Sequence, residues 1–401
     1  MIKLLRFVTG YFAPERKEVA MIFVPISVSL RLSLLCWSVN TALGKGEISC
    51  KNAAGQDVDW FVVYKLPKTQ PNNRFYWTPN GEEMAYYGSD SQMRTWEMLP
   101  SSIYHKKFNP IWETLKPAYG KQSKVAYACY NDQPPDKFGG TRGGHSKGVL
   151  MASDNGVGGT VWLQHSVPRF VDDLEKSYFY PPNGRENGQL FLCISFHLNT
   201  VETIASHLQV QAAHVYNRRL RPWVKKFPTF WKLLNKTYMR DPNTLKIDVL
   251  WTRAGRRVLA VAKSPRYARD IYTHDMMAAM KDSIIVQSWK NGKGGAQDSF
   301  CGSKYTVTDT TFLHIGNNAK QAYFSTREDH SKWYVTKTKA IFCFSSLNRM
   351  CSQRSRGGEI TCLEDFYLAR LFRNSIAESS TCKGFNIRSA LKYSKLMATC
   401  S

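Results

Sequence analysis

Two copies of the tripeptide His-Ser-Lys lie far apart in this sequence, at His145–Lys147 and at His330–Lys332. On an extended strand, a histidine and a lysine two residues apart point to the same face. One imidazole and one ammonium group could therefore meet the same phosphate. Two such pairs, taken from two halves of a chain, could close on one phosphodiester from opposite sides.

A histidine and a lysine at this spacing are a weak signal when they occur once, because the pattern also arises by chance. His105-Lys106-Lys107 shows the same spacing, and we interpret it as part of a basic surface. For any single histidine of this kind, an ordinary surface or core imidazole is the alternative. The identical middle serine and the wide separation distinguish His145 and His330 from His105.

Cleavage of a phosphodiester needs a nucleophile, an acid for the leaving oxygen, and positive charge beside the non-bridging oxygens. The chain has no convincing carboxylate or Cys/His cluster with the spacing of a metal site. Two histidines and two lysines could do this work without a metal or other cofactor. One neutral imidazole would attack phosphorus to form a phosphohistidine, and the other, protonated, would donate to the leaving oxygen and then activate water. Lys147 and Lys332 would hold the phosphoryl oxygens. Since one histidine must be charged and the other neutral, activity should favour mildly acidic pH.

The residues after each tripeptide predict the strands that would hold it. Residues 148–152 and 160–166 are β-branched and apolar runs joined by an Asp-Asn-Gly turn, which predicts a hairpin. In the second half, residues 333–335 and 340–344 predict the same succession of strand, turn and strand. The offsets are similar, with 20 residues from His145 to His165 and 18 from His330 to Asn348. We interpret this as a weak internal duplication.

The rest of the chain predicts a mixture of strands and helices. Apolar residues at helical spacing predict a helical region over residues 201–235, broken at Pro222 and Pro228, and residues 270–281 predict a helix. Gly292–Gly295 lacks the spacing of a phosphate-binding P-loop, so no nucleotide cofactor is expected. Runs of β-branched and aromatic residues predict further strands at 60–67, 125–130, 189–196, 245–251, 257–262 and 283–289.

The net positive charge of the chain indicates which classes of partner it could bind. The 401 residues suffice for two or three domains or for one large bilobal domain. The net charge of +24 attracts polyanions such as nucleic acid, an anionic membrane or a sulfated glycan. A solvated basic surface without a special partner is the alternative.

The N-terminus predicts export. An apolar run from Met21 ends in Ala42-Leu43-Gly44, small residues at the two positions that a signal peptidase reads. We therefore expect residues 1–44 to hold a signal peptide that is cleaved after Gly44. An uncleaved anchor is the alternative, which Arg31 disfavours because it interrupts the run. No later segment is apolar enough to span a bilayer.

Export would leave a basic chain with an odd number of cysteines. Residues 1–44 carry five basic and two acidic residues, so the mature net charge would be +24 − 3 = +21. Nine cysteines would remain, and an odd count in an oxidising compartment leaves at least one thiol free or bridged to another chain. Asn235-Lys236-Thr237 is a glycosylation acceptor, which agrees with secretion.

Five segments of the chain carry a resemblance to a known family. They are Asp59–Pro67, Tyr130–Pro135, His145–Val149, His165–Pro168 and Glu328–Trp333. Together they resemble the deoxyribonuclease II family of acid endonucleases, over a range from about Cys50 to Cys382. The resemblance implies a pseudo-dimeric fold like that of phospholipase D, with halves at 45–205 and 206–382, and a basic tail at 383–401. It also implies metal-independent cutting of double-stranded DNA at acid pH, which leaves 3′-phosphates, in a lysosome or outside the cell.

The resemblance also assigns roles. His145 with Lys147 matches the first catalytic pair of the family, and His330 with Lys332 matches the second. We assign His145 as the nucleophile and His330 as the general acid and base, although the two roles could be reversed. The supporting residues that match family motifs are His165 and Asn348, and the implied disulfides are Cys301–Cys382 and Cys343–Cys362.

The sequence departs from the family in places. Ser346 stands where the family has the aspartate of Asp-Met-Asn-Arg, a change that could weaken turnover. The usual partner of Cys50 falls near Arg185, so Cys50 would pair with Cys193 or Cys129 instead. A homologue that binds DNA but cuts slowly is therefore one alternative. A phosphodiesterase that acts on lipid head groups is another, because fold does not fix substrate. The basic charge and the family's flanking motifs favour DNA.

Overall fold

The computed structural model describes residues 48–70, 76–136, 143–156, 158–237, 244–292 and 294–382. The expected signal peptide, its cleavage site after Gly44 and the basic tail at 383–401 lie outside the described residues. Within them the strands form two large sheets and the helices are short, so the expected mixed α+β fold is confirmed. No helix in these ranges is long and apolar enough to cross a bilayer.

The first sheet carries the first His-Ser-Lys tripeptide at the start of a strand. Its eight strands within the described residues lie in the order β10-β6-β7-β8-β9-β3-β4-β5, and the hairpin after His145 is β7 paired with β8. All neighbouring pairs are antiparallel. The strands are β3 (Trp60–Lys65), β4 (Met84–Gly88), β5 (Glu97–Met98), β6 (Ala126–Asn131), β7 (Lys147–Ser153), β8 (Gly159–His165), β9 (Gln189–Phe196) and β10 (Val215–Arg219).

The second sheet carries the second tripeptide in the same way. Its main path is β11-β12-β19-β18-β17-β13-β15-β14, with β16 and β20 paired to β15. In this sheet β13 runs parallel to β15. The strands are β11 (Leu245–Trp251), β12 (Arg257–Lys263), β13 (Ile284–Gln287), β14 (Phe300–Cys301), β15 (Thr306–Asn317), β16 (Lys320–Ser325), β17 (Trp333–Thr336), β18 (Ile341–Ser345), β19 (Gly358–Glu364) and β20 (Ile376–Ser379).

Both sheets contain the same run of strands. The antiparallel order β6-β7-β8-β9-β3 in the first sheet matches β13-β17-β18-β19-β12 in the second, and each tripeptide leads into the second strand of its run. The register nevertheless differs from the pairing of His165 with Asn348 that the sequence offsets suggest. His165 lies opposite Lys147, whereas Ser345 lies opposite Lys332. Because β17 and β18 are shorter than β7 and β8, equal offsets along the chain do not mark equivalent positions.

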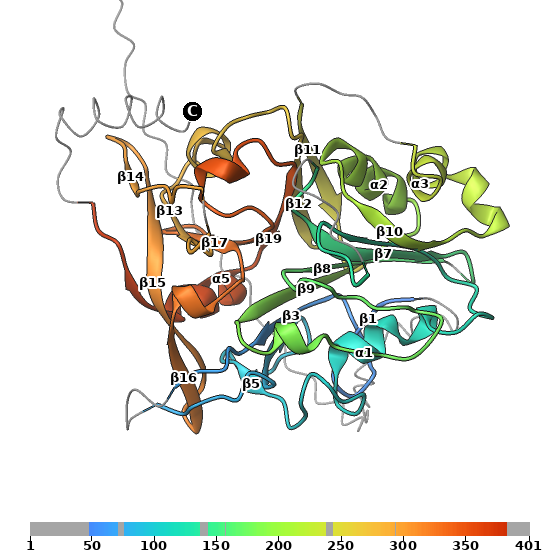
Figure 1. Ribbon diagram of the computed structural model, residues 1–401, viewed down its shortest axis with the longest axis horizontal. Coiled ribbons are helices and arrows are strands. Elements are labelled where there is room, and N and C mark those ends of the chain that lie inside the picture. The colour runs from blue at the N-terminus through green and yellow to red at the C-terminus, as the bar shows by residue number, and fades with distance from the viewer. Residues whose placement is uncertain are drawn as a thin grey trace, which may run out of the picture. The chain divides into compact units, whose positions relative to one another are not determined.

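The largest of the three hydrophobic clusters in the described residues lies between the sheets. Leu150 and Leu192 of the first sheet and Val335 and Phe344 of the second belong to one buried hydrophobic cluster. Helices α2 and α5 add apolar side chains to it, and α2 packs against α3 beside the first sheet (Figure 1). The helices are α1 (Pro110–Leu115), α2 (Thr200–Val210), α3 (Pro228–Leu234), α4 (Met277–Met280, which follows a π-helical turn at Tyr272–Met276) and α5 (Phe366–Asn374).

The helical region expected at 201–235 is partly wrong. Helix α2 ends at Val210, and Ala212 adopts a left-handed conformation with φ of 53°, which stops the helix. The chain then forms β10, because Val215–Arg219 pairs with β6 at the edge of the first sheet. The boundary expected at residue 205 therefore does not coincide with the division between the sheets.

Three disulfides lie in the described residues. Cys301–Cys382 and Cys343–Cys362 are the pairs that the family resemblance implies. Cys50 pairs with Cys193, one of the two partners considered for it, and ties the β1–β2 ribbon (Cys50–Lys51 and Asp57–Val58) to β9. Cys129, the other partner considered, is a buried free thiol.

Candidate active site

Each His-Ser-Lys tripeptide is anchored on the sheet opposite its own. The backbone N–H of His145 donates to the carbonyl of Gly357, which directly precedes β19, at 2.7 Å. The backbone N–H of His330 donates to the carbonyl of Gly188, which directly precedes β9, at 2.9 Å. In both places the glycine forms a parallel bridge with the residue before the histidine. Each sheet thus holds the histidine of the other through an equivalent backbone contact, and these two contacts bring the histidines together.

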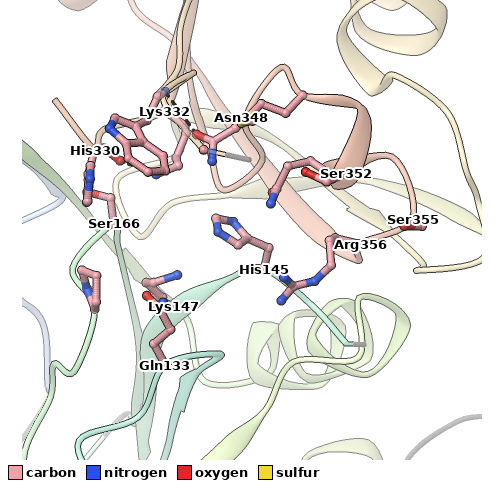
Figure 2. Close-up of a pocket in the computed structure, with 15 residues that line it drawn as sticks. Gln133, His145, Lys147, Ser166, His330, Lys332, Asn348, Ser352, Ser355 and Arg356 are labelled. Atoms are coloured by element: carbon pink, nitrogen blue, oxygen red, sulfur yellow. Dashed lines mark hydrogen bonds between the residues drawn. The ribbon is translucent and has the colours of Figure 1, made fainter. Parts of the chain in front are cut away.

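The two tripeptides meet at one cavity. His145, Lys147, His330, Lys332 and Asn348 line a space of about 680 Å³, and Figure 2 shows their side chains around it. These are five of the six catalytic and supporting residues named from the sequence. Further lining residues are Gln133, Ser166, Pro168, Trp289, Met350 and Arg356.

The ring of His145 is oriented by a main-chain group. Its Nδ1 lies 2.7 Å from the carbonyl oxygen of Ser346. A carbonyl can only accept, so Nδ1 carries the proton and Nε2 of the neutral ring keeps its lone pair. Burial, and then the positive charge of Lys147, lowers the pKa of His145 to about 3. The free site therefore holds a neutral imidazole with Nε2 as its basic atom.

A buried carboxylate, Asp132, organises the cations beside His145. Its Oδ1 accepts from Lys147 Nζ at 2.5 Å, and its Oδ2 accepts from Arg356 Nη2 at 3.1 Å. Oδ2 also lies 4.0 Å from Nε2 of His145. Burial alone would raise the pKa of Asp132, but Lys147, His145 and Arg356 together hold it well below its ordinary value. Asp132 is therefore an anion that fixes the direction of the Lys147 ammonium group.

His330 packs against an aromatic wall. Its ring meets Trp289 edge-on, with the ring centroids 4.6 Å apart. Burial, and then the positive charges of Lys332 and Lys147, lowers the pKa of His330 to about 3. Lys332 itself is desolvated, and burial followed by repulsion from Lys147 lowers its pKa to about 7. Both histidines are thus neutral in the free site except in strong acid.

Asn348 is held in place by the backbone of Trp289. Its Oδ1 accepts from the backbone N–H of Trp289 at 3.1 Å. Because Oδ1 is occupied by this hydrogen bond, Nδ2 of the amide can act as a donor at the cavity.

His165 does not line this cavity. Its side chain is buried beside Phe170 and Phe191, with ring centroids 5.2 and 5.8 Å away. Its Nδ1 accepts from the backbone N–H of Val167 at 3.2 Å. Burial, and then Lys147, lowers the pKa of His165 well below its ordinary value. In this position His165 is a packed neutral residue under the strand end that carries Lys147.

Ser346 contacts His145 through its backbone and not through its side chain. The Ser346 Oγ instead accepts from the backbone N–H of Glu359 at 2.9 Å. Glu359 is wholly buried, where it accepts from Gln211 Nε2 at 2.8 Å, and burial raises its pKa to about 7. The serine that replaces the family aspartate thus leaves the hydrogen bond to His145 intact.

Restoring the family aspartate with Ser346→Asp is expected not to raise the rate of DNA cleavage. The new carboxyl group would enter a buried site next to Glu359, so the free energy of unfolding should fall by about 1–3 kcal/mol. Plasmid cleavage and urea unfolding of the variant, with Ser346→Ala beside it, test this. A large gain in rate for Ser346→Asp alone would contradict the expectation and favour a weakened wild-type enzyme.

Several residues of the site could not be predicted from the sequence. Asp132 directly follows β6, and Asn131 at the end of β6 pairs with Lys147 at the start of β7. The position of Asp132 beside Lys147 could be predicted only if the pairing of β6 with β7 were known, because that pairing brings the two strand ends together. Trp289 and Arg356 come from loops after β13 and before β19, and no local motif marks them.

Comparison with known proteins gives the same family over nearly the whole described range. The family profile described as Deoxyribonuclease II matches residues 49–382. A human protein named deoxyribonuclease-2-beta is 30% identical over 361 residues, which cover 88% of this chain and 96% of the relative. Plancitoxin-1 of Acanthaster planci is 30% identical and covers 90% and 100%. Cell-death-related nuclease 7 of Caenorhabditis elegans is 31% identical and covers 87% and 92%.

Among solved structures, a phosphatidylserine synthase of Haemophilus influenzae resembles this chain weakly. The TM-score is 0.28 at 9% identity, over 64% of this chain and 69% of the synthase. A likeness of this size carries no argument about fold or activity.

Proposed function

This chain belongs to the deoxyribonuclease II family, and on that premise we propose that it hydrolyses double-stranded DNA at acid pH without a metal ion. The observation that carries the proposal is the meeting of both His-Ser-Lys tripeptides at one cavity. Two imidazoles and two ammonium groups then face one phosphate from two sides, which is the set of groups that the reaction needs.

In the first step, Nε2 of His145 attacks phosphorus and the bond from phosphorus to the 5′-oxygen breaks. The hydrogen bond from Nδ1 to Ser346 supports this role, because it leaves the lone pair on Nε2. His330 gives its proton to the departing 5′-oxygen. The product of this step is a phosphohistidine that carries the 3′-phosphate strand.

In the second step, His330 acts as a base. It takes a proton from water, the oxygen of that water attacks phosphorus, and the bond from phosphorus to Nε2 of His145 breaks. The strand leaves with a 3′-phosphate. Lys147, Lys332 and the amide of Asn348 hold the non-bridging oxygens in both steps, and Asp132 holds Lys147 in place.

Two further observations support a DNA strand as the substrate. The net charge of +24 favours a polyanion that is bound through its phosphates. A second cavity of about 520 Å³ shares Gln133, Pro168 and His330 with the first, so a strand could extend past His330 on that side.

We also propose a secreted or lysosomal location. The three disulfides that join described residues to one another suit an oxidising compartment. The expected glycosylation acceptor, Asn235, is exposed just after α3. Both features agree with the signal peptide expected in residues 1–44.

Activity is expected to rise as the pH falls from neutral into the acid range. His330 must carry a proton in the first step, and its pKa of about 3 in the free site limits the protonated fraction. A bound phosphodiester anion raises this pKa, so kcat should reach its plateau at a higher pH than kcat/KM. Lys332, with a pKa of about 7, loses its charge as the pH rises through that value, which removes activity on the alkaline side.

Profiles of kcat and kcat/KM against pH test this assignment. In Lys332→Arg the guanidinium stays charged, so the alkaline loss should move to higher pH even if kcat is reduced. A wild-type profile that is flat from about pH 5 to about pH 8 would contradict the roles of both residues.

The proposed function is tested by plasmid cleavage at about pH 5 in excess EDTA. Nicked and linear products with 3′-phosphate ends are expected, and the rate should fall steeply as salt rises, because binding depends on phosphate contacts. Loss of activity in EDTA would reveal a metal requirement. Retarded but uncut DNA would favour the alternative of a DNA-binding homologue, and hydrolysis of phospholipid vesicles in place of DNA would favour a lipid phosphodiesterase.

A further inference from the structure

Two buried lysines outside the cavity occupy equivalent places in the two sheets. Lys65 is the last residue of β3, and Lys263 is the last residue of β12. Both side chains are fully buried, and both lysines stand two residues before a proline, Pro67 or Pro265. Lys65 pairs with Gln189 of β9, and Lys263 pairs with Gly358 of β19, the strands that follow the two bridging glycines.

The ammonium groups of the two lysines make the same contacts. Lys65 Nζ donates to the carbonyls of Arg185 and Asn187 at 2.9 and 2.5 Å. These residues lie three and one positions before Gly188. Lys263 Nζ donates to the carbonyls of Arg354 and Arg356 at 2.7 and 2.6 Å, three and one positions before Gly357.

Each of these glycines holds a histidine of the opposite sheet. Gly188 accepts from the backbone of His330, and Gly357 accepts from the backbone of His145. Neither position has room for a side chain. A Cβ at Gly188 would lie 2.6 Å from Oδ1 of Asp329, and one at Gly357 would lie 1.9 Å from a backbone oxygen. The loops must therefore approach closely, and the lysines fix the two carbonyls nearest that approach.

A buried ammonium group is unfavourable unless hydrogen bonds satisfy it. An apolar side chain could fill the same space, but it would leave the carbonyls of the loop without donors. The fold uses a charged donor at this place twice, with identical offsets, at the two loops that support histidines. Packing alone would not require this repetition.

We propose that Lys65 and Lys263 are positioning residues, which hold the loops before Gly188 and Gly357 so that His330 and His145 meet across the cavity. This inference deepens the proposed function and rests on it. Lys263 acts on His145 through Gly357, and Lys65 acts on His330 through Gly188. Neither lysine touches the substrate.

The two lysines differ in one respect that a measurement can use. Burial is the largest cause of the lowered pKa of His330, and the ammonium groups of Lys332, Lys147 and Lys65 lower it further. Lys263 is not among the charged groups that act on His145, which are Lys147, Asp132, Lys332 and Arg356. Removal of the Lys65 charge should therefore raise the pKa of His330, whereas removal of the Lys263 charge should leave the pKa of His145 unchanged.

The experiment uses the full secreted protein with Lys65→Met and Lys263→Met, and the exposed Lys121→Met as the matched control. For DNA cleavage, kcat should fall by about 10–100-fold in both buried variants while KM stays within about twofold, because the histidines are displaced and phosphate binding is not. The control should match the wild type. Histidine ring titration by NMR should show the upward pKa shift of His330 in Lys65→Met alone.

The titration separates a failure of this inference from a failure of the proposed function. If the wild type cuts no DNA, the proposed function fails, while a displacement of the His330 ring signals in Lys65→Met and of the His145 ring signals in Lys263→Met still supports the positioning role. Wild-type kcat and unshifted titration in the methionine variants would overturn it. Should a methionine variant not fold, Lys65→Gln and Lys263→Gln, which keep a neutral donor, replace it. Failure of the glutamine variants to fold as well would overturn the proposal, because the lysines would then serve stability alone.

Discussion

Replacement of either His145 or His330 with alanine is expected to lower the rate of DNA cleavage by at least about a thousandfold, because each removes a group that forms or breaks a bond. The two rings lie at one cavity, and their backbones are fixed by equivalent bonds at 2.7 and 2.9 Å. Neither ring is needed for the core, since both are only partly buried at the cavity edge. The folded state should therefore survive both changes, and DNA binding should stay close to that of the wild type.

His105→Ala is the matched control. His105 belongs to the third histidine and lysine pair at the same spacing, but its side chain is exposed and does not line the cavity. Its replacement should leave the rate unchanged. A comparable loss in His105→Ala, or substantial cleavage by His330→Ala, would show that the two tripeptides do not form the catalytic centre.

The same two variants decide which histidine is the nucleophile. A thymidine 3′-phosphodiester with a p-nitrophenyl leaving group needs no acid in the first step, because the phenolate leaves unaided. With His145 as the nucleophile, His330→Ala should release about one equivalent of p-nitrophenolate and then stop at the phosphohistidine. His145→Ala should show no burst. The opposite pattern would reverse the two roles.

The two histidine and lysine pairs that meet at the cavity could be predicted from the sequence because each pair is local. A histidine and a lysine two residues apart on a strand share a face whatever the rest of the chain does. The repetition of His-Ser-Lys then supplied the second half of the site. Local signals also gave the hairpin after His145, where the apolar runs and the turn residues between them agree.

The remaining features depend on pairing between distant segments. Val215 continues the helical spacing of Leu208 and Ala212, yet Val215–Arg219 forms β10 because it pairs with β6 at the edge of the first sheet. Asp132 becomes part of the site only when β6 and β7 pair. His165 belongs to a family motif, but Phe170 and Phe191 enclose it, and only packing reveals this.

The sequence also contains a repeated pattern, Lys-x-Pro, whose role becomes visible only in the structure. A strand ends at Lys65 of Lys65-Leu66-Pro67 and at Lys263 of Lys263-Ser264-Pro265. The first segment lies in the half that supports His330, and the second lies in the half that supports His145. The sequence alone gives no reason to connect them, since the repeated partner is a pair of backbone carbonyls and has no side-chain identity.

Asp132→Asn is expected to be the most damaging conservative change at the site. The substitution keeps the shape of the side chain but leaves Lys147 and Arg356, both nearly buried, without their shared anion. Removal of one partner from a buried ion pair lowers the free energy of unfolding by about 3–5 kcal/mol. The rate should also fall, because Lys147 loses the bond that directs its ammonium group towards the phosphate. Glu364→Gln breaks an exposed pair with Arg257 and is the control, since such pairs contribute under about 1 kcal/mol.

The pH dependence of this loss of stability has a definite sign. Asp132 has a pKa in the folded state well below that in the unfolded chain, because the charges of Lys147 and Arg356 outweigh its burial. Its contribution to stability is therefore complete above the unfolded pKa of about 4, and it disappears only as the pH falls through the lower folded value. Urea unfolding at about pH 5 should show the full difference between wild type and Asp132→Asn, and the difference should shrink in stronger acid. Absence of this difference at about pH 5, or its growth in stronger acid, would mean that Asp132 is not the anion that holds Lys147 and Arg356 at the pH proposed for the reaction.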